Sequence, residues 1–123
     1  MKYLCLAYYN ETQFNALPKA EVDALVAQCQ SHDEDLHNSG QMILVGSLAA
    51  TQSSMSLRPH QGQPAITDGP FAETKEQLGA FFIIEAQDLN DAVRVASKHP
   101  AAHLGENVGW GIEVRPIEFF QQS

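Results

Sequence analysis

The chain has 123 residues, of which 44% are hydrophobic and 18% are charged, a composition typical of a folded domain and unlike that of a disordered chain. Its formal net charge of −8 argues against nucleic acid as a partner, because binding to phosphates requires a basic surface. The same charge disfavours anionic membrane surfaces. At this length we expect a single domain, residues 1–123.

The apolar segment from Tyr3 to Tyr9 is predicted to be a strand and not a targeting signal. It is too short for a secretory core, and polar residues follow it at once. No other apolar run approaches the roughly 20 residues that a membrane helix needs. Cys5 and Cys29 both fall in apolar patterns, so a disulfide framework is not expected. We therefore expect a cytoplasmic protein.

Hydrophobic patterning predicts alternating strands and helices along the chain. Strands are predicted over residues 2–9, 42–48, 79–86 and 110–119, helices over 18–39 and 89–99, and hairpin arms over 54–60 and 64–67. Pro18 lies in the first turn of the first helix and Gly40 just past its end, while Asp88 caps the second helix and Pro100 ends it. A βαβ unit, a hairpin insertion and a second βαβ unit are typical of a ferredoxin-like α+β sandwich.

Three of the predicted strands are apolar on both faces, namely the segments Tyr3 to Tyr8, Met42 to Val45 and Ala80 to Ile84. Antiparallel sheets with one solvated face alternate between apolar and polar residues, and these strands do not. Two helices cover only one face of a four-stranded sheet. We therefore predict a homodimer in which the sheets of two copies pack face to face.

The first predicted helix carries two polar residues on or beside its apolar stripe. The stripe consists of Val22, Leu25, Val26, Cys29 and Leu36. Asp33 falls inside it and His32 at its margin, and an inward acid is costly unless it is paired or near solvent. Either the helix end frays toward solvent, or Asp33 bonds a backbone group, or the two residues are acid–base groups that line a cleft.

The residues Asp68-Gly69-Pro70 predict a tight turn that leads into a charged segment. Asp68 either caps this turn or belongs to a site. The charged residues that follow are Glu73, Lys75 and Glu76. Either these residues form a solvent-exposed connection with local ion pairs, or Lys75 binds an anionic ligand.

Arg58 and Arg115 are the other candidate ligand-binding residues. Arg115 shares a predicted strand face with Glu113, so the two form either an interface ion pair or the cationic wall of a pocket. Because an arginine side chain can donate two hydrogen bonds to one carboxylate, such a wall suits a small organic acid.

The remaining histidines carry little functional signal in the sequence. His37, His60, His99 and His103 are expected at helix ends, in a loop or at the hairpin tip. The histidines and cysteines lack the spacing of a zinc site, and the glycines do not form a nucleotide-binding motif. We therefore expect neither a metal nor a cofactor.

Residues 66–86, ITDGPFAETKEQLGAFFIIEA, resemble the signature of the DGPF-type branch of the YCII-related proteins. The opening MKYLCLAYYN, the segment IIEAQDLNDAV and the closing IEVRPIEFF extend the resemblance over nearly the whole chain. It implies a dimer of the α+β-barrel type. The wider family includes enzymes that act on muconolactone-like ring compounds, some of them with a His–Asp pair. The family's helix histidine falls on Cys29 here, with His32 about one turn later.

Two functions follow from these observations and stay open at this stage. The first is a cofactor-free isomerase, lyase or dehalogenase that acts on a small anionic or cyclic compound. Asp33, His32 or Asp68 would move protons in such an enzyme, and Arg58 or Arg115 would hold charge. The second is a dimeric ligand-binding or regulatory module without turnover, for which DGPF-type genes near alternative sigma factors suggest a regulatory setting.

Overall fold

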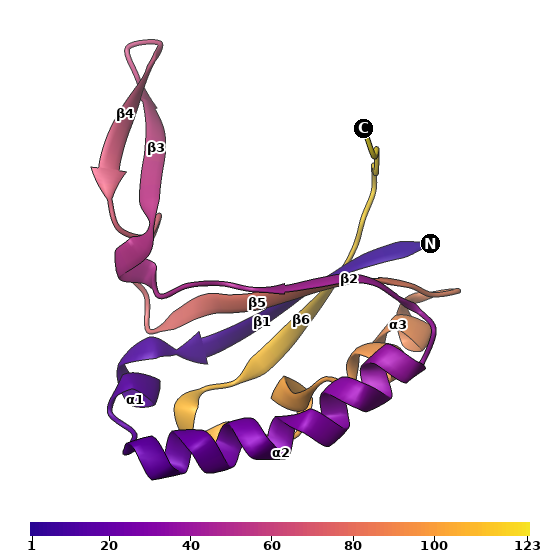
Figure 1. Cartoon of the computed structure of the whole chain (residues 1–123). Coiled ribbons are helices and arrows are strands. Elements are labelled where there is room, and N and C mark those ends of the chain that lie inside the picture. Colours follow the sequence, from indigo (N-terminus) through magenta and orange to yellow (C-terminus); the bar gives the residue numbers. More distant parts are fainter.

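The computed structural model describes residues 1–123 and confirms the predicted ferredoxin-like α+β fold (Figure 1). The strands are β1 (Lys2–Asn10), β2 (Met42–Ser47), β3 (Met55–His60), β4 (Gln63–Asp68), β5 (Glu76–Glu85) and β6 (Gly111–Pro116). The helices are α1 (Glu11–Asn15), α2 (Lys19–Asn38) and α3 (Leu89–Ala96), with 3-10 turns η1 (Thr51–Ser53), η2 (Pro100–Ala102) and η3 (Glu106–Val108).

Four strands form one antiparallel sheet in the order β2-β5-β1-β6. Each long connection crosses over one strand, because α2 joins β1 to β2 and α3 joins β5 to β6. Both helices lie on the same face of the sheet, as Figure 1 shows. This is the topology that the order of elements predicted. None of the helices is long and apolar enough to cross a membrane.

The hydrophobic core lies on the helical face of the sheet, and α3 contributes more of it than α2 does. Its buried residues are Tyr3, Cys5, Leu36, Phe82, Ile84, Ala86, Ala92, Val95 and Ala96. Three of them belong to α3, whereas α2 contributes only Leu36 near its C-terminal end. The rest of α2 is therefore not held by the core. Val26, which was predicted to face inward, is 60% exposed, because the half-buried side of α2 runs through Leu25 and Cys29 instead.

Three predicted element boundaries are wrong, each for an identifiable physical reason. α3 ends at Ala96 and does not reach His99, because the residue before Pro100 is extended, with φ −68° and ψ 144°. β5 begins earlier than predicted, at Glu76, where it still pairs with the end of β1. β6 ends at Pro116, which has no N–H for a ladder hydrogen bond. The short helix α1 was not predicted.

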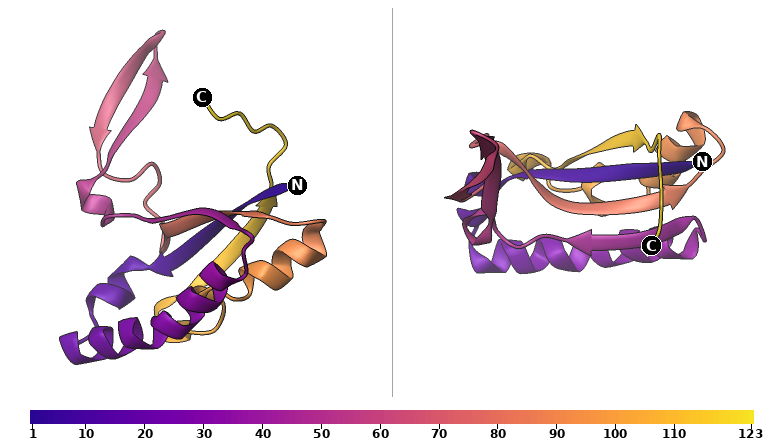
Figure 2. Two further views of the ribbon diagram at one scale, coloured as in Figure 1. Left: turned by 45° about the vertical axis from the view of Figure 1, so that its right-hand side comes forward. Right: turned by 90° about the horizontal axis from the view of Figure 1, so that it is seen from above.

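The β3–β4 hairpin forms a second, two-stranded sheet that stands away from the body of the molecule. It projects from the side of the main sheet opposite the helices (Figures 1 and 2). Gln61 and Gly62 form its turn, and both have positive φ values, 51° and 78°. This backbone conformation matches the right-handed twist of the two strands.

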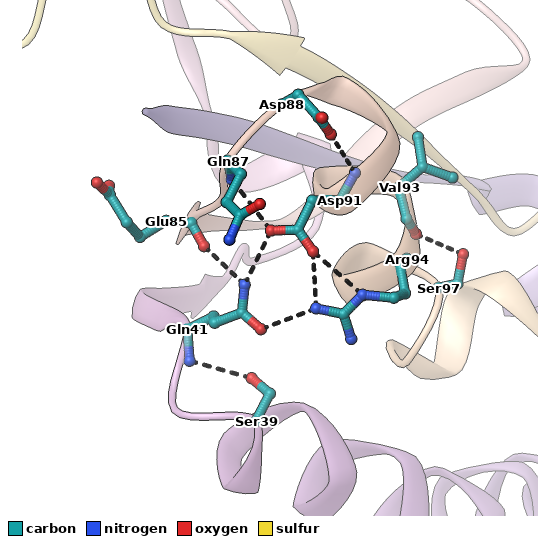
Figure 3. Close-up of polar contacts among 9 residues, drawn as sticks. All are labelled: Ser39, Gln41, Glu85, Gln87, Asp88, Asp91, Val93, Arg94 and Ser97. Atoms are coloured by element: carbon teal, nitrogen blue, oxygen red, sulfur yellow. Dashed lines mark hydrogen bonds and ion pairs between the residues drawn. The ribbon is translucent and has the colours of Figure 1, made fainter.

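A polar network joins the start of β2 to the turn between β5 and α3 (Figure 3). Asp91 accepts hydrogen bonds from the Gln87 backbone N–H at 3.0 Å and from Arg94 at 2.7 Å. Gln41 donates to Asp91 at 3.4 Å, and Arg94 donates to Gln41 at 3.2 Å. The Gln87 bond, followed by Arg94, lowers the pKa of Asp91. Because these groups satisfy one another, the network is structural.

Candidate functional site

The structure contains an apolar cleft of about 430 Å³ between α2 and the helical face of the sheet. It lies where β1 ends and β5 begins, and η2 forms a further side. Leu36 is the only residue of α2 that is buried in the core, so the middle of the helix leaves a space between itself and the sheet. A volume of this size suits a small molecule.

Asp33 contributes a carboxyl group to the cleft from α2. Although much of the residue is accessible to solvent, its carboxyl makes no hydrogen bond or ion pair within the chain. Partial burial raises the pKa of Asp33 above its ordinary value, and the charge of His32 opposes this shift. Asp33 is therefore an acid without a partner at the edge of an apolar space, where a proton-transferring group is useful.

His99 contributes an imidazole to the same cleft from the start of η2. Its ring stacks on Phe82, with centroids 4.9 Å apart and planes 6° from parallel. The Ala101 backbone N–H donates to Nδ1 at 3.0 Å, so the neutral ring carries its proton on Nε2. Burial, aided by the charge of His32, lowers the pKa of His99 to about 4. At neutral pH this residue is thus an uncharged hydrogen-bond donor.

The pKa of His99 predicts a loss of stability in mild acid. Unfolded His99 binds a proton near pH 6.5 and the folded residue only near pH 4, so between these values the unfolded state binds more protons. The free energy of unfolding should fall by about 2 kcal/mol between pH 7 and pH 5 from this residue alone. Urea unfolding at several pH values measures it.

The variant His99→Gln isolates this contribution and should flatten the stability profile between pH 7 and pH 5 relative to the parent protein. The carboxylates with lowered pKa values, Glu11, Glu85 and Asp91, are present in both proteins, so their contribution cancels in the comparison. An unchanged slope in His99→Gln would show that the imidazole is not held neutral by burial.

His32 lies outside the cleft, although it is adjacent to Asp33 in the sequence. Its ring stacks on His103, with centroids 4.9 Å apart and planes 14° from parallel. His32 and Asp33 make no hydrogen bond to each other, as expected for neighbouring positions of a helix. His32 therefore acts on the cleft only through its charge, which influences both Asp33 and His99.

Asp68 is exposed at the end of β4 and does not line the cleft. The turn after it is held by neighbouring groups: Gly69 donates its N–H to the Ser54 carbonyl at 2.8 Å, and the Ser56 hydroxyl donates to the Gly69 carbonyl at 2.8 Å. Gly69 has φ +101°, a conformation that favours glycine. The Asp68 carboxyl itself makes no hydrogen bond in the structure.

The three predicted ligand anchors also lie away from the cleft and away from one another. Arg58 stacks over the Phe71 ring, 3.8 Å from its centroid, and donates to the Phe71 carbonyl at 2.8 Å. Arg115 forms an ion pair with Glu113 on β6. Lys75 lines a separate, wider groove on the chain. Of the six predicted site residues, the structure therefore places only Asp33 in the cleft.

Trp110 and Tyr8 separate the cleft from the groove that contains Lys75, because both residues line both spaces. The indole of Trp110 lies directly against Gly105, which has φ +73°. A Cβ at this position would be 2.2 Å from Trp110 Cδ2. The glycine thus allows the indole to form the wall of the cleft.

Sequence reasoning missed His99 and Trp110 as parts of the site. His99 was assigned to a helix end, where its only unusual feature is that it precedes Pro100. The signal near Trp110 is the pair of glycines before it, Gly105 and Gly109, both of which have positive φ. Neither sequence pattern shows that His99 or Trp110 lines a cleft, because only the fold brings their two segments together beside the end of β1.

The fold and the site together define a ferredoxin-like α+β protein with an apolar cleft that presents an unpaired acid and a neutral imidazole. The sequence profile of the YCII-related domain matches residues 1–119, so the chain belongs to this family. An uncharacterized protein of Rhizobium meliloti (strain 1021) is 30% identical over 121 residues, covering 98% of this chain and 95% of the relative.

A solved structure with a similar chain trace is a 5-chloro-2-hydroxyhydroquinone dehydrochlorinase of Burkholderia phenoliruptrix AC1100, in complex with 2,5-dihydroxybenzoquinone. The two chains share 14% identity with a TM-score of 0.49, over 96% of this chain and 94% of the other. A similarity at this level implies no common reaction.

Proposed function

We propose that this protein is a cofactor-free enzyme that moves a proton on a small cyclic compound bound in the cleft. The observation that carries the proposal is that Asp33 and His99, an acid without a partner and a neutral imidazole, line the same apolar space. Acid–base catalysis requires such groups near the reacting atoms and away from bulk water.

The two side chains have complementary chemical roles in this proposal. The Asp33 carboxylate removes a proton from the carbon next to a carbonyl group, and the electron pair of that C–H bond moves onto the carbonyl oxygen. The Nε2–H of His99 donates a hydrogen bond to the enolate oxygen that forms. When a C=C double bond of the ring adjoins the carbon that loses the proton, the enolate extends over that double bond. Asp33 then returns the proton to the far carbon of the double bond, which gives an isomer of the starting compound with no net gain or loss of atoms.

Exchange of carbon-bound protons with solvent tests this function without knowledge of the natural substrate. We expect the protein to accelerate deuterium uptake into cyclohexanone in D2O, followed by proton NMR. Asp33→Asn should lower the enzyme-catalysed rate by about 100-fold, the lower end of typical acid–base contributions. Asp68→Asn, which removes an exposed carboxyl outside the cleft, should retain the rate. Equal loss in both variants would contradict the role of Asp33.

The alternative is a ligand-binding module with the same cleft and no turnover. It predicts that cyclohexanone binds without any exchange above the solvent background. A regulatory role linked to sigma factors receives no support from the family or from the relative. If the protein binds cyclohexanone but causes no proton exchange, we would conclude that it is a ligand-binding module and not an enzyme.

We also propose that the protein is a homodimer that covers the second face of its sheet. The face opposite the helices presents apolar residues from three neighbouring strands: Leu4, Leu6, Leu44, Phe81 and Ile83. They are half-buried or exposed in the single chain, and Leu44 is 38% exposed. An apolar sheet face of this kind is the surface that a second copy of the chain would cover.

The β3–β4 hairpin supports the same proposal, because its two faces differ in polarity. Met55, Leu57 and Ile66 lie on one face and are 60–63% exposed, while Ser56 and Arg58 lie on the other. An isolated two-stranded hairpin is marginally stable in water. The hairpin stands on the side of the molecule where no helix covers the main sheet (Figure 2), so its apolar residues and the open sheet face would pack against the second copy together.

A charge on the open sheet face should weaken the dimer strongly. Leu44→Lys introduces that charge once in each copy, and losing two buried leucines costs about 3 kcal/mol or more, or about 100-fold in the dissociation constant. Val26→Lys makes the same change at an exposed position of α2 on the helical side and should leave the mass unchanged. Light scattering over a dilution series measures the mass, and a dimeric Leu44→Lys protein would contradict this interface.

A further inference from the structure

We infer that the cleft selects an uncharged ring-shaped molecule with a hydroxyl or carbonyl group, and that it rejects organic anions. This inference rests on the proposed function of the cleft as the ligand site. It narrows the expected ligand, because the sequence predicts a small anionic or cyclic compound with arginine and lysine as anchors.

The charge of the cleft wall is the first observation behind this inference. No lysine or arginine lines the cleft, and Asp33 is its only carboxyl group. A bound carboxylate would therefore lose its hydration without gaining a positive partner, and it would meet a second carboxylate. The cationic side chains that could have bound an anion lie elsewhere. Arg58 stacks on Phe71 and donates to its carbonyl, and Arg115 forms an ion pair with Glu113.

The shape of the wall is the second observation. Tyr9 and Phe14 line the cleft and meet edge to face, with centroids 5.9 Å apart and planes 81° apart. The Tyr9 hydroxyl donates to Glu11 at 2.7 Å, and a Cβ at Gly79 would lie 2.9 Å from the Tyr9 ring. Fixed aromatic surfaces of this kind, with Trp110 on another side, favour a compact ring over a flexible chain.

The polar groups of the cleft provide the third observation. The Nε2–H of His99 has no partner within the chain and can donate, while Asp33 can accept, or donate when it is protonated. This pair matches a hydroxyl or carbonyl group, which accepts from His99 and interacts with Asp33. An ammonium group has no lone pair to accept the His99 hydrogen bond.

Three compounds that share one ring and differ in charge test the inference: cyclohexanol, cyclohexanecarboxylate and cyclohexylamine at pH 7. Trp110 is the only tryptophan of the chain and lines the cleft, so its fluorescence reports binding there. We expect cyclohexanol to bind at least about tenfold more tightly than cyclohexanecarboxylate, which Asp33 repels, and more tightly than cyclohexylamine, whose attraction to Asp33 is offset by the loss of its hydration. Asp33→Asn should reduce the discrimination against cyclohexanecarboxylate several-fold.

Because Trp110 also lines the groove that contains Lys75, the control variant is Lys75→Gln. Cyclohexanol binding should be unchanged in this variant, and a change would show that the ligand occupies the wrong groove and overturn the inference. Equal affinities, or tighter binding of either charged compound, would overturn the inference and leave the cleft as a ligand site. Absence of any fluorescence change with all three compounds would overturn the proposed function together with the inference.

Discussion

Replacement of Phe82 by alanine is expected to lower the free energy of unfolding by about 3–5 kcal/mol. Phe82 is fully buried in β5, opposite Cys5 of β1, so the substitution leaves a cavity in the middle of the core. It also removes the ring on which His99 stacks. Urea denaturation at one fixed protein concentration measures the loss.

The control for Phe82→Ala is a phenylalanine near the C-terminus of the chain. Phe119 is 79% exposed, so Phe119→Ala should change the free energy of unfolding by less than about 0.5 kcal/mol. A loss below about 1 kcal/mol for Phe82→Ala would show that this residue is not in the core. The assignment of the helical face of the sheet would then be wrong.

Gly105→Ala is expected to destabilise the protein by about 2–4 kcal/mol and to move the wall of the cleft. The left-handed conformation costs a residue with a Cβ about 1–2 kcal/mol, and the collision with Trp110 adds an overpacking cost of similar size. Because Trp110 is the contacted group, its fluorescence spectrum should also shift in the folded variant. Denaturation and emission spectra measure the two effects.

Gly40→Ala separates the cost of the left-handed conformation from the cost of the collision with Trp110. Gly40 has φ +74°, close to the value of Gly105, but a Cβ there would meet no atom within 4 Å. This variant should lose about 1–2 kcal/mol and leave the Trp110 spectrum unchanged. Equal losses in the two variants would mean that the contact between Gly105 and Trp110 does not matter.

The fold could be predicted from the sequence because its signals are local. Strands β1 and β5 each contain a continuous apolar run, the Asp88 carboxyl caps α3 by accepting from the Asp91 N–H at 2.8 Å, and Gly40 follows α2. Their order leaves few topologies for a chain of this size. The boundaries that failed are those set by pairing between distant strands or by a single proline.

The cleft could be predicted only in part, because it depends on how far α2 lies from the sheet. The apolar stripe of α2 indicated an inward Asp33, and this residue lines the cleft. The stripe could not show that only Leu36 would be buried in the core, leaving space beside the sheet. His99 enters this space through the packing of its ring on Phe82, a contact between segments with no shared sequence pattern.

The anchors predicted from single charged residues did not gather at the cleft for a related reason. A sequence shows that Arg58, Lys75 and Arg115 carry charge. It does not show which neighbouring groups in the folded chain already interact with that charge. In the structure Arg58 and Arg115 are engaged by neighbours, and Lys75 lies in a different groove. The resulting cleft wall is apolar with one acid, which narrows the expected ligand from a small anionic or cyclic compound to an uncharged ring.

A crystal structure of the protein soaked with cyclohexanone tests the central claim, that the cleft beside α2 is the functional site. We predict the ring between Tyr9 and Trp110, with its oxygen about 3 Å from His99 Nε2 or from the Asp33 carboxyl. Density for the ring in the groove beside Lys75, or against the β3–β4 hairpin, with an empty cleft would contradict the claim.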